Sequence, residues 1–267
     1  MSSGTRLLVI ALSTLALGYL LLCVLVWAGQ RALMFPAPRA AVPLPGGRGY
    51  ARVEAGVLLV RAPPQEPAPW VVYFHGNGEQ LSDLEGTAEA LQARGLGFLG
   101  VEYPGYGWAG GAPTEAGLYA AGRSALAWLQ RERGVGPERV VLLGRSLGSG
   151  VAVQLAQEGR CARLVLVSPY TSMGDMAAAV FPWLPGRLLV RDRFDSLSKA
   201  AGLHVPTLVV HGTRDEVVPV AQGRRLAAAI PGASALWVEG AGHNDVLERG
   251  WGGAQPFERV VQFARGD

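Results

Sequence analysis

Seven short apolar runs between residues 57 and 238 constrain the fold of this chain more than any other feature. Most of their residues are β-branched or aromatic, and stretches rich in alanine and leucine separate the later runs. The apolar runs are 57–60, 70–74, 98–101, 140–143, 164–167, 207–210 and 236–238, and the stretches of helical character are 84–94, 115–133, 150–157, 220–230 and 257–264. Apolar strands that alternate with helices are typical of a mainly parallel sheet covered on both faces. We therefore expect an α/β fold.

The alternation runs to the end of the chain without an internal repeat or a second linker. Residues 50–267 have the length of one large domain, so we expect them to form a single domain. About 39 residues separate the runs at 164–167 and 207–210. They are too few for a large cap domain, and we expect a short lid at about 170–204.

The N-terminal part contains 22 residues, 7–28, without a single charge. As a helix they would be about 33 Å long, enough to cross a hydrocarbon core of roughly 30 Å. A cleaved signal peptide and a buried soluble helix are the alternatives, but the apolar part of a signal peptide is only about 7–15 residues long. We expect residues 1–29 to be a retained single-pass anchor and residues 30–49, rich in proline and glycine, to be a stalk. Arg6 on one side and Arg31 with Arg39 on the other give too little asymmetry to fix the orientation.

The charged residues and cysteines exclude several classes of protein. There are 24 Lys and Arg against 21 Asp and Glu, and no run of basic residues is longer than two, so nucleic acid is not an expected partner. Cys23 lies in the apolar segment, so Cys23 and Cys161 do not indicate a disulfide framework. No cluster of cysteine and histidine indicates a structural metal.

The sequence Gly144-Arg145-Ser146-Leu147-Gly148 matches the pattern G-x-S-x-G. The match alone is weak, since a glycine-rich turn before a helix would give it as well. Here an apolar strand leads directly into it and a helix of small residues follows it. A nucleophilic serine on a sharp strand-to-helix turn requires this layout. Ser146 is therefore the candidate nucleophile.

A serine nucleophile needs a base, and histidine is the side chain whose pKa suits that task. In the α/β-hydrolase order of serine, acid and histidine, the histidine comes last, which selects His243. Asp215 follows the run at 207–210 and is placed to orient the imidazole, although it could instead cap the next helix. His211 is expected to be structural.

Backbone amides must meet the negative charge that develops on a substrate carbonyl oxygen. We expect one amide from Leu147, the residue after the nucleophile, at the start of a helix. The second is expected from Asn77, between two glycines in the loop after the run at 70–74. This loop could also be no more than a tight turn.

The chain resembles the serine hydrolases of the α/β-hydrolase fold, and more narrowly their Bem46-like group, which includes α/β hydrolase domain-containing proteins 12, 13 and 17. The resemblance spans roughly residues 30–265. Six motifs carry it in order: HGNG (75–78), YPGYG (103–107), GRSLGSG (144–150), SP (168–169), HGTRDEVVP (211–219) and GAGHND (240–245). Glu102 departs from the group, which usually has Asp there, at a position that is structural in the family.

This resemblance implies hydrolysis of carboxylic esters or thioesters through an acyl-enzyme, without a cofactor or catalytic metal. Characterised members of the group act on lysophospholipids, monoacylglycerols or S-palmitoylated proteins. We expect a small-molecule or lipid acyl substrate, with Tyr106, Phe181 and Trp183 lining its pocket, and a location in a bacterial inner membrane. A peptidase of the prolyl-oligopeptidase type and a non-catalytic scaffold remain the alternatives, and the oligomeric state is open.

Overall fold

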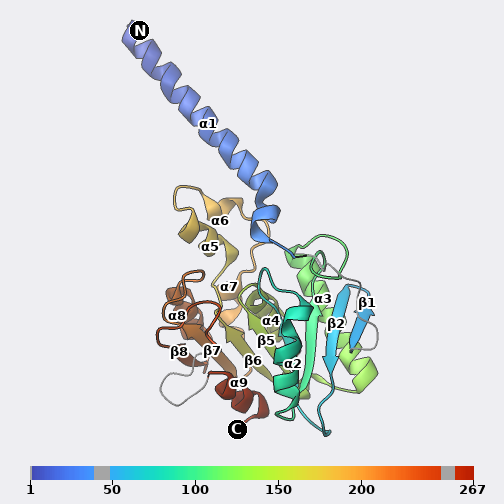
Figure 1. Ribbon diagram of the computed structural model, residues 1–267. Helices are drawn as coiled ribbons and strands as arrows, with labels where there is room; N and C mark the ends of the chain where they lie inside the picture. The colour runs from blue at the N-terminus through green and yellow to red at the C-terminus, as the bar shows by residue number, and fades with distance from the viewer. Residues whose placement is uncertain (1, 39–48, 248–255) are drawn as a thin grey trace.

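The computed structural model describes residues 2–38, 49–247 and 256–267 of the chain. Its centre is an eight-stranded sheet in the order β1-β2-β4-β3-β5-β6-β7-β8, in which β1 with β2 and β2 with β4 are antiparallel and every other pair is parallel (Figure 1). The strands are β1 Tyr50–Val53, β2 Gly56–Arg61, β3 Trp70–Phe74, β4 Gly97–Glu102, β5 Val140–Arg145, β6 Arg163–Val167, β7 Thr207–Gly212 and β8 Ser234–Val238. The expected mainly parallel α/β sheet is confirmed.

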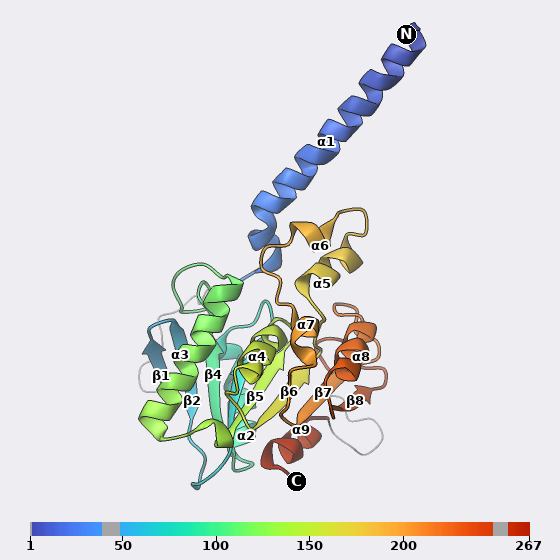
Figure 2. The same cartoon turned by 180° about the vertical axis from the view of Figure 1, so that it is seen from behind.

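Helices cover both faces of the sheet. The α-helices are α1 Ser3–Met34, α2 Glu85–Gln92, α3 Glu115–Arg133, α4 Leu147–Gln157, α5 Met173–Val180, α6 Gly186–Leu189, α7 Ser196–Ala200, α8 Val220–Ala229 and α9 Pro256–Arg265, and short 3-10 helices occupy Leu81–Leu84 and Pro137–Arg139. Apolar residues of α3, α4, α7 and α8 pack on one face (Figure 2), and those of α2 and α9 pack on the other. Strands β3 and β4 are buried along their whole length, which is why their sequences are apolar on both faces.

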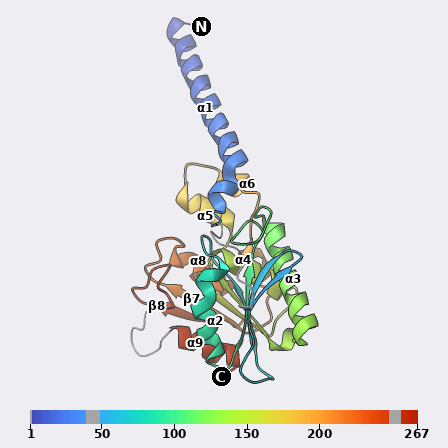
Figure 3. The same cartoon turned by 45° about the vertical axis from the view of Figure 1, so that its right-hand side comes forward.

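Helix α1 is the longest element, and it leaves the domain at the end where α5 and α6 lie (Figures 1 and 3). It is long and apolar enough to cross a membrane: the mean hydropathy of its most apolar 18-residue window is 2.6, and only 6% of that window is buried. The helix continues to Met34, so residues 30–34 are helical where a stalk is expected. Residues 39–48 of the expected stalk lie outside the described part of the chain.

The segment between β6 and β7 forms three short helices rather than a cap domain. Helices α5 and α6 contact each other and stand over the end of the sheet where the parallel strands finish, while α7 packs on α4 (Figure 2). Side chains cap two of the helices: Ser172 accepts a hydrogen bond from the Asp175 amide at α5, and Asp195 accepts one from the Ser198 amide at α7. We call residues 173–192, which include α5 and α6, the lid.

Candidate active site

Ser146 lies at the sharp turn between β5 and α4. Its φ of 48° and ψ of −116° are unfavourable for a side chain larger than glycine, so the surrounding contacts must hold the turn. The Ser146 amide donates to the Val167 carbonyl at 2.9 Å, and the Ser149 hydroxyl donates to the Ser146 carbonyl at 2.6 Å. These bonds present the Ser146 side chain at the carboxyl end of the sheet.

Gly148 allows the turn to pack against the sheet. A Cβ atom at this position would collide with the backbone carbonyl of Phe74 in β3, which cannot move without disturbing the sheet. We expect Gly148→Ala to destabilise the protein by about 1–3 kcal/mol or more, as overpacked sites do. Thermal unfolding measures this effect. Gly86→Ala is the control, because a Cβ at that exposed position in α2 meets nothing within 4 Å, and an equal loss in both variants would contradict the argument.

The structure brings Ser146, His243 and Asp215 into one hydrogen-bonded chain. The Ser146 Oγ atom is 3.0 Å from Nε2 of His243, and Nδ1 of His243 is 2.8 Å from Oδ2 of Asp215. Ser146 follows β5, Asp215 follows β7 and His243 follows β8, so the sheet brings together residues far apart in sequence. With the Nδ1 proton donated to the carboxylate, Nε2 is free to accept the serine proton.

The Asp215 carboxylate is held by more than the histidine it orients. Its Oδ1 atom accepts hydrogen bonds from the amides of Val217 at 2.9 Å and Val218 at 2.7 Å. Its Oδ2 atom is also 3.2 Å from Nε2 of buried His211. Burial would raise the pKa of the Asp215 carboxyl, but hydrogen bonds from the two histidines and the backbone outweigh it and lower that pKa well below its usual range. Asp215 is therefore ionised and fixed.

His211 contributes more than the structural role expected from sequence. Its Nε2 atom faces both the Val218 carbonyl at 2.9 Å and the Asp215 carboxylate, and its ring is fully buried. The sequence signal is its place at the end of β7, four residues before Asp215, which brings the ring against the loop that carries the acid. His211 thus helps to position Asp215.

The two expected oxyanion donors both lie near Ser146: Leu147 follows it in the chain, and a Cβ atom on Gly76, the residue before Asn77, would be 3.5 Å from the Ser146 Cβ. Leu147 is the first residue of α4, where a helix leaves backbone amides without an intrahelical partner. The side chain of Asn77 is fixed at both ends: its Nδ2 donates to the Met34 carbonyl at 2.6 Å, and its Oδ1 accepts from the Tyr106 hydroxyl at 2.5 Å. The side chain is thus engaged by Met34 and Tyr106, and the Asn77 backbone amide stays the predicted donor to an oxyanion.

Arg145 connects two loops of the candidate site to the turn at Ser146. This role was not expected from the sequence. Arg145 forms an ion pair with Glu79, whose other oxygen accepts the Gly76 amide at 2.5 Å. Its second nitrogen donates to the Asn244 side chain at 3.1 Å and to the His243 carbonyl at 3.4 Å. Arg145 therefore joins the loop that carries Gly76 and Glu79 to the loop that carries His243 and Asn244. These contacts could not be predicted from the sequence, because Glu79 and Asn244 lie 66 and 99 residues away from Arg145 along the chain.

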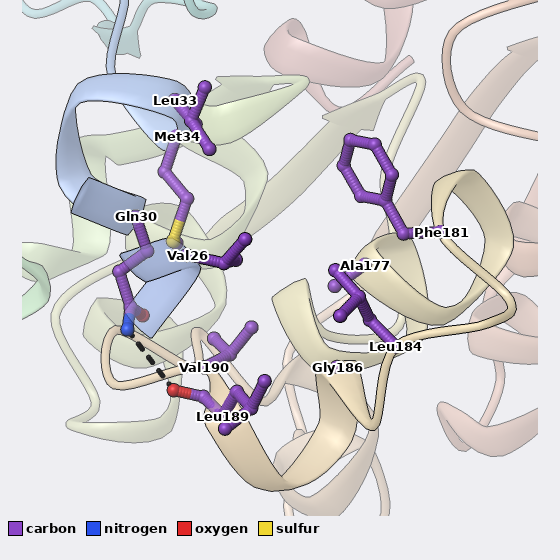
Figure 4. Close-up of a pocket in the computed structure, with 10 residues that line it drawn as sticks. All are labelled: Val26, Gln30, Leu33, Met34, Ala177, Phe181, Leu184, Gly186, Leu189 and Val190. Carbon is purple, nitrogen blue, oxygen red and sulfur yellow. Dashed lines mark hydrogen bonds between the residues drawn. The ribbon is translucent and has the colours of Figure 1, made fainter. Parts of the chain in front are cut away.

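The residues expected to line a substrate pocket lie in two places. Phe181 and Trp183 pack edge to face in the lid, with ring centroids 6.1 Å apart, and Phe181 lines an apolar pocket between the lid and α1 (Figure 4). Trp183 is 56% exposed, whereas Tyr106 is fully buried and donates its hydroxyl to Asn77. Neither Tyr106 nor Trp183 is among the residues that line this apolar pocket, so a substrate pocket shared by the three side chains stays a prediction.

Glu102 lies at the end of β4, completely buried beside His75. The His75 Nε2 and Glu102 Oε1 atoms are 3.2 Å apart, and the Leu81 amide donates to Oε2 at 3.3 Å. Glu102 thus lies beneath the loop that carries His75 and Asn77, which fits the structural role expected for Glu102. Over residues 2–38, 49–247 and 256–267, no group of three or more His, Cys, Asp or Glu side chains is arranged to hold a metal ion.

Two family models match the chain over its catalytic region. The model described as α/β hydrolase fold matches residues 69–196, which include Ser146, and one described as TAP-like protein matches residues 190–254, which include Asp215 and His243. An uncharacterised protein of Mycobacterium tuberculosis is 38% identical over 231 residues, covering 82% of each chain. The human α/β hydrolase domain-containing protein 17C is 35% identical over 210 residues, which is 78% of this chain and 61% of that protein.

Solved structures share the fold at lower identity. A monoacylglycerol lipase from Paleococcus ferrophilus has a TM-score of 0.61 at 19% identity, covering 81% of this chain and 99% of its own. An enol-lactonase from Burkholderia xenovorans has a TM-score of 0.60 at 24% identity, covering 82% and 100%. The family match and these esterase- and lipase-like folds support a hydrolase. The chain belongs to the α/β hydrolase family and, within it, to the ABHD type.

Proposed function

We propose that this chain is a membrane-anchored serine hydrolase that cleaves carboxylic esters or thioesters through an acyl-enzyme. The observation that carries the proposal is the hydrogen-bonded chain from Ser146 through His243 to Asp215, with distances of 3.0 and 2.8 Å. A hydroxyl, an imidazole and a buried carboxylate in this order are the parts that nucleophilic acyl transfer requires.

The reaction begins when Oγ of Ser146 attacks the substrate carbonyl carbon and its proton passes to Nε2 of His243. The carbonyl oxygen becomes an oxyanion, which the amides of Asn77 and Leu147 stabilise. Collapse breaks the bond to the leaving alcohol or thiol, which takes the proton from His243. Water then attacks the acyl-serine by the same route and releases the carboxylic acid, so that Ser146 and His243 regain their starting protonation.

Helix α1 supplies the proposed membrane anchor, and its contacts favour retention over cleavage as a signal peptide. Tyr19 and Trp27 lie within the apolar segment, yet both contact the lid: the Tyr19 hydroxyl donates to the Trp183 carbonyl at 2.9 Å, and the Arg191 guanidinium stacks over Trp27 at 3.4 Å. Cleavage after Ala28 would remove both contacts. We place the protein in a bacterial inner membrane as a single-pass protein.

A fluorophosphonate probe tests the proposed activity. We expect the full-length protein in detergent to be labelled at Ser146, as located by mass spectrometry of its peptides. Ser146→Ala and a heat-denatured sample should remain unlabelled, and Ser82→Ala, which changes an exposed serine, should label normally. Failure to label the folded protein would favour a non-catalytic scaffold, and labelling of another serine would show that Ser146 is not the nucleophile.

A further inference from the structure

The lid is fixed to the end of α1 by a set of polar contacts centred on Gln30. This side chain is 5% exposed; its Nε2 donates to the Leu189 carbonyl at 3.1 Å and its Oε1 accepts from the Arg191 amide at 2.8 Å. The neighbouring Arg31 binds the Asp192 carboxylate at 2.8 Å. The last turns of α1 and the lid therefore form one unit above the active site.

Between these two elements lies an apolar pocket (Figure 4). Residues from α1 form one wall and residues from the lid form the opposite wall. The lining residues are Val26, Gln30, Leu33, Met34, Ala177, Phe181, Leu184, Gly186, Leu189 and Val190. Gln30 is the one polar side chain in this lining, and its amide already bonds to the backbone of α1 and the lid. The pocket therefore suits an apolar chain rather than a polar ligand.

The pocket approaches the proposed reaction centre at Met34, although Ser146, His243 and Asp215 are not among the residues that line it. Met34, one of its lining residues, accepts a hydrogen bond from the side chain of Asn77, whose amide is the proposed oxyanion donor. Gly76, the preceding residue, lies so close to Ser146 that a Cβ placed on it would be 3.5 Å from the Ser146 Cβ. A chain bound in the pocket would thus have one end near the nucleophile.

The outer end of the pocket faces the membrane in which α1 would lie. Val26 lines the pocket and belongs to the uncharged segment 7–28. The outer edge of the lid carries exposed apolar side chains: Val180, Phe181, Trp183 and Leu188 are 57, 42, 56 and 81% exposed. The bond from Tyr19 to Trp183 sets this edge against the middle of the apolar segment. Such an edge is stable when it dips into the bilayer.

We propose that the pocket between α1 and the lid binds the acyl chain of a membrane-lipid ester, which enters it sideways from the bilayer. The membrane helix is then a wall of the substrate site as well as an anchor. This inference rests on the proposed function, because it assigns the acyl substrate of Ser146. An acyl chain is the occupant that matches an apolar pocket that faces hydrocarbon at one end and, at the other, contacts the loop beside Ser146 through Met34.

Filling the pocket tests this assignment. Ala177→Phe places a phenyl ring on the pocket wall, and Ala179→Phe places the same ring on an exposed part of α5 outside it. The substrates are 4-nitrophenyl acetate and 4-nitrophenyl palmitate in mixed micelles, with the full-length protein. We expect Ala177→Phe to lower kcat/KM for the palmitate at least tenfold and to change that for the acetate less than twofold. Ala179→Phe should change neither by more than twofold.

The outcomes separate this inference from the proposed function. A wild-type protein that neither hydrolyses the acetate nor reacts with the fluorophosphonate overturns the proposed function itself. If it hydrolyses the acetate but not the palmitate, or if Ala177→Phe lowers both activities equally while fluorophosphonate labelling stays normal, only the acyl pocket is overturned.

A second measurement does not require the Ala177→Phe variant to fold. Ser146→Ala in phosphatidylcholine vesicles is irradiated with a lysophosphatidylcholine whose palmitoyl chain carries a diazirine. We expect crosslinks on the peptides that contain Leu33 and Leu189, which line the pocket from opposite sides. Crosslinks confined to residues 7–22, where the bilayer would surround α1, would overturn the proposal.

Discussion

Ser146→Ala is expected to lower kcat for 4-nitrophenyl acetate by about 10⁵ to 10⁶-fold, the loss seen when the nucleophile of a triad is removed. Without the hydroxyl, His243 has no proton to accept and no acyl-enzyme forms. Within the described part of the chain, the Ser146 hydroxyl forms a hydrogen bond with His243 alone, so the fold should be retained. Steady-state hydrolysis and thermal unfolding measure the two effects.

The pair of Ser146 and His243 offers an internal check on this result. Because the two side chains act as one unit, the variant Ser146→Ala/His243→Ala should be no slower than Ser146→Ala alone. Losses that multiply in the double variant would show that the two residues act independently. A Ser146→Ala variant that unfolds at the wild-type temperature and keeps more than one hundredth of the activity would contradict the proposed mechanism.

Asp215→Asn should lower kcat by about 10⁴-fold, because an amide at this position stabilises the wrong tautomer of the imidazole. The surroundings of Asp215 favour a large effect. Its carboxylate accepts hydrogen bonds from two backbone amides and lies against the rings of His211 and His243. The adjacent Glu216 is exposed. Glu216→Gln is therefore the matched control and should retain wild-type activity within about twofold.

The lowered pKa of Asp215 also predicts how the stability of the protein depends on pH. A carboxyl whose pKa is lower in the folded than in the unfolded protein stabilises the fold above its unfolded pKa of about 3.9, and this stability is lost as the pH falls towards the folded value. The difference in unfolding free energy between the wild type and Asp215→Asn should thus shrink as the pH falls below about 4. A difference that stays the same below this pH would mean that the fold does not lower the pKa of Asp215.

Much of the fold could be predicted from the sequence because buried parallel strands must be apolar on both faces. All seven apolar runs lie in strands β2 to β8. Strand β1 was missed because it is a four-residue edge strand with no fully buried residue, so its sequence lacks the apolar signal. The short lid helices α5, α6 and α7 were missed for a related reason: four to eight residues give too few turns to establish a helical period.

The hydrogen-bonded residues of the candidate site were predictable to the extent that each sits beside a strand end. Ser146, Asp215 and His243 follow β5, β7 and β8, and a parallel sheet brings such positions to one edge. The contacts of Arg145 and the pocket between α1 and the lid were not predictable, because each joins segments far apart in the chain. The burial of Tyr106 and the exposure of Trp183 were not predictable for the same reason, since composition alone does not tell which layer a side chain enters.

The hydrogen bond between Met34 and Asn77 has a consequence for where the substrate must sit. Met34 lies six residues beyond Ala28, the end of the uncharged segment, which is about 9 Å along a helix axis. That height is close to the thickness of the head-group layer on one side of a bilayer, roughly 5–8 Å. With α1 in the membrane, Met34 and the neighbouring Ser146 would lie at the outer side of the head-group layer, whereas the ester groups of glycerolipids lie at its inner boundary. An ester would then have to rise out of the bilayer by about the height of that layer to reach Ser146, and the apolar pocket would shield the part of the acyl chain that leaves the hydrocarbon.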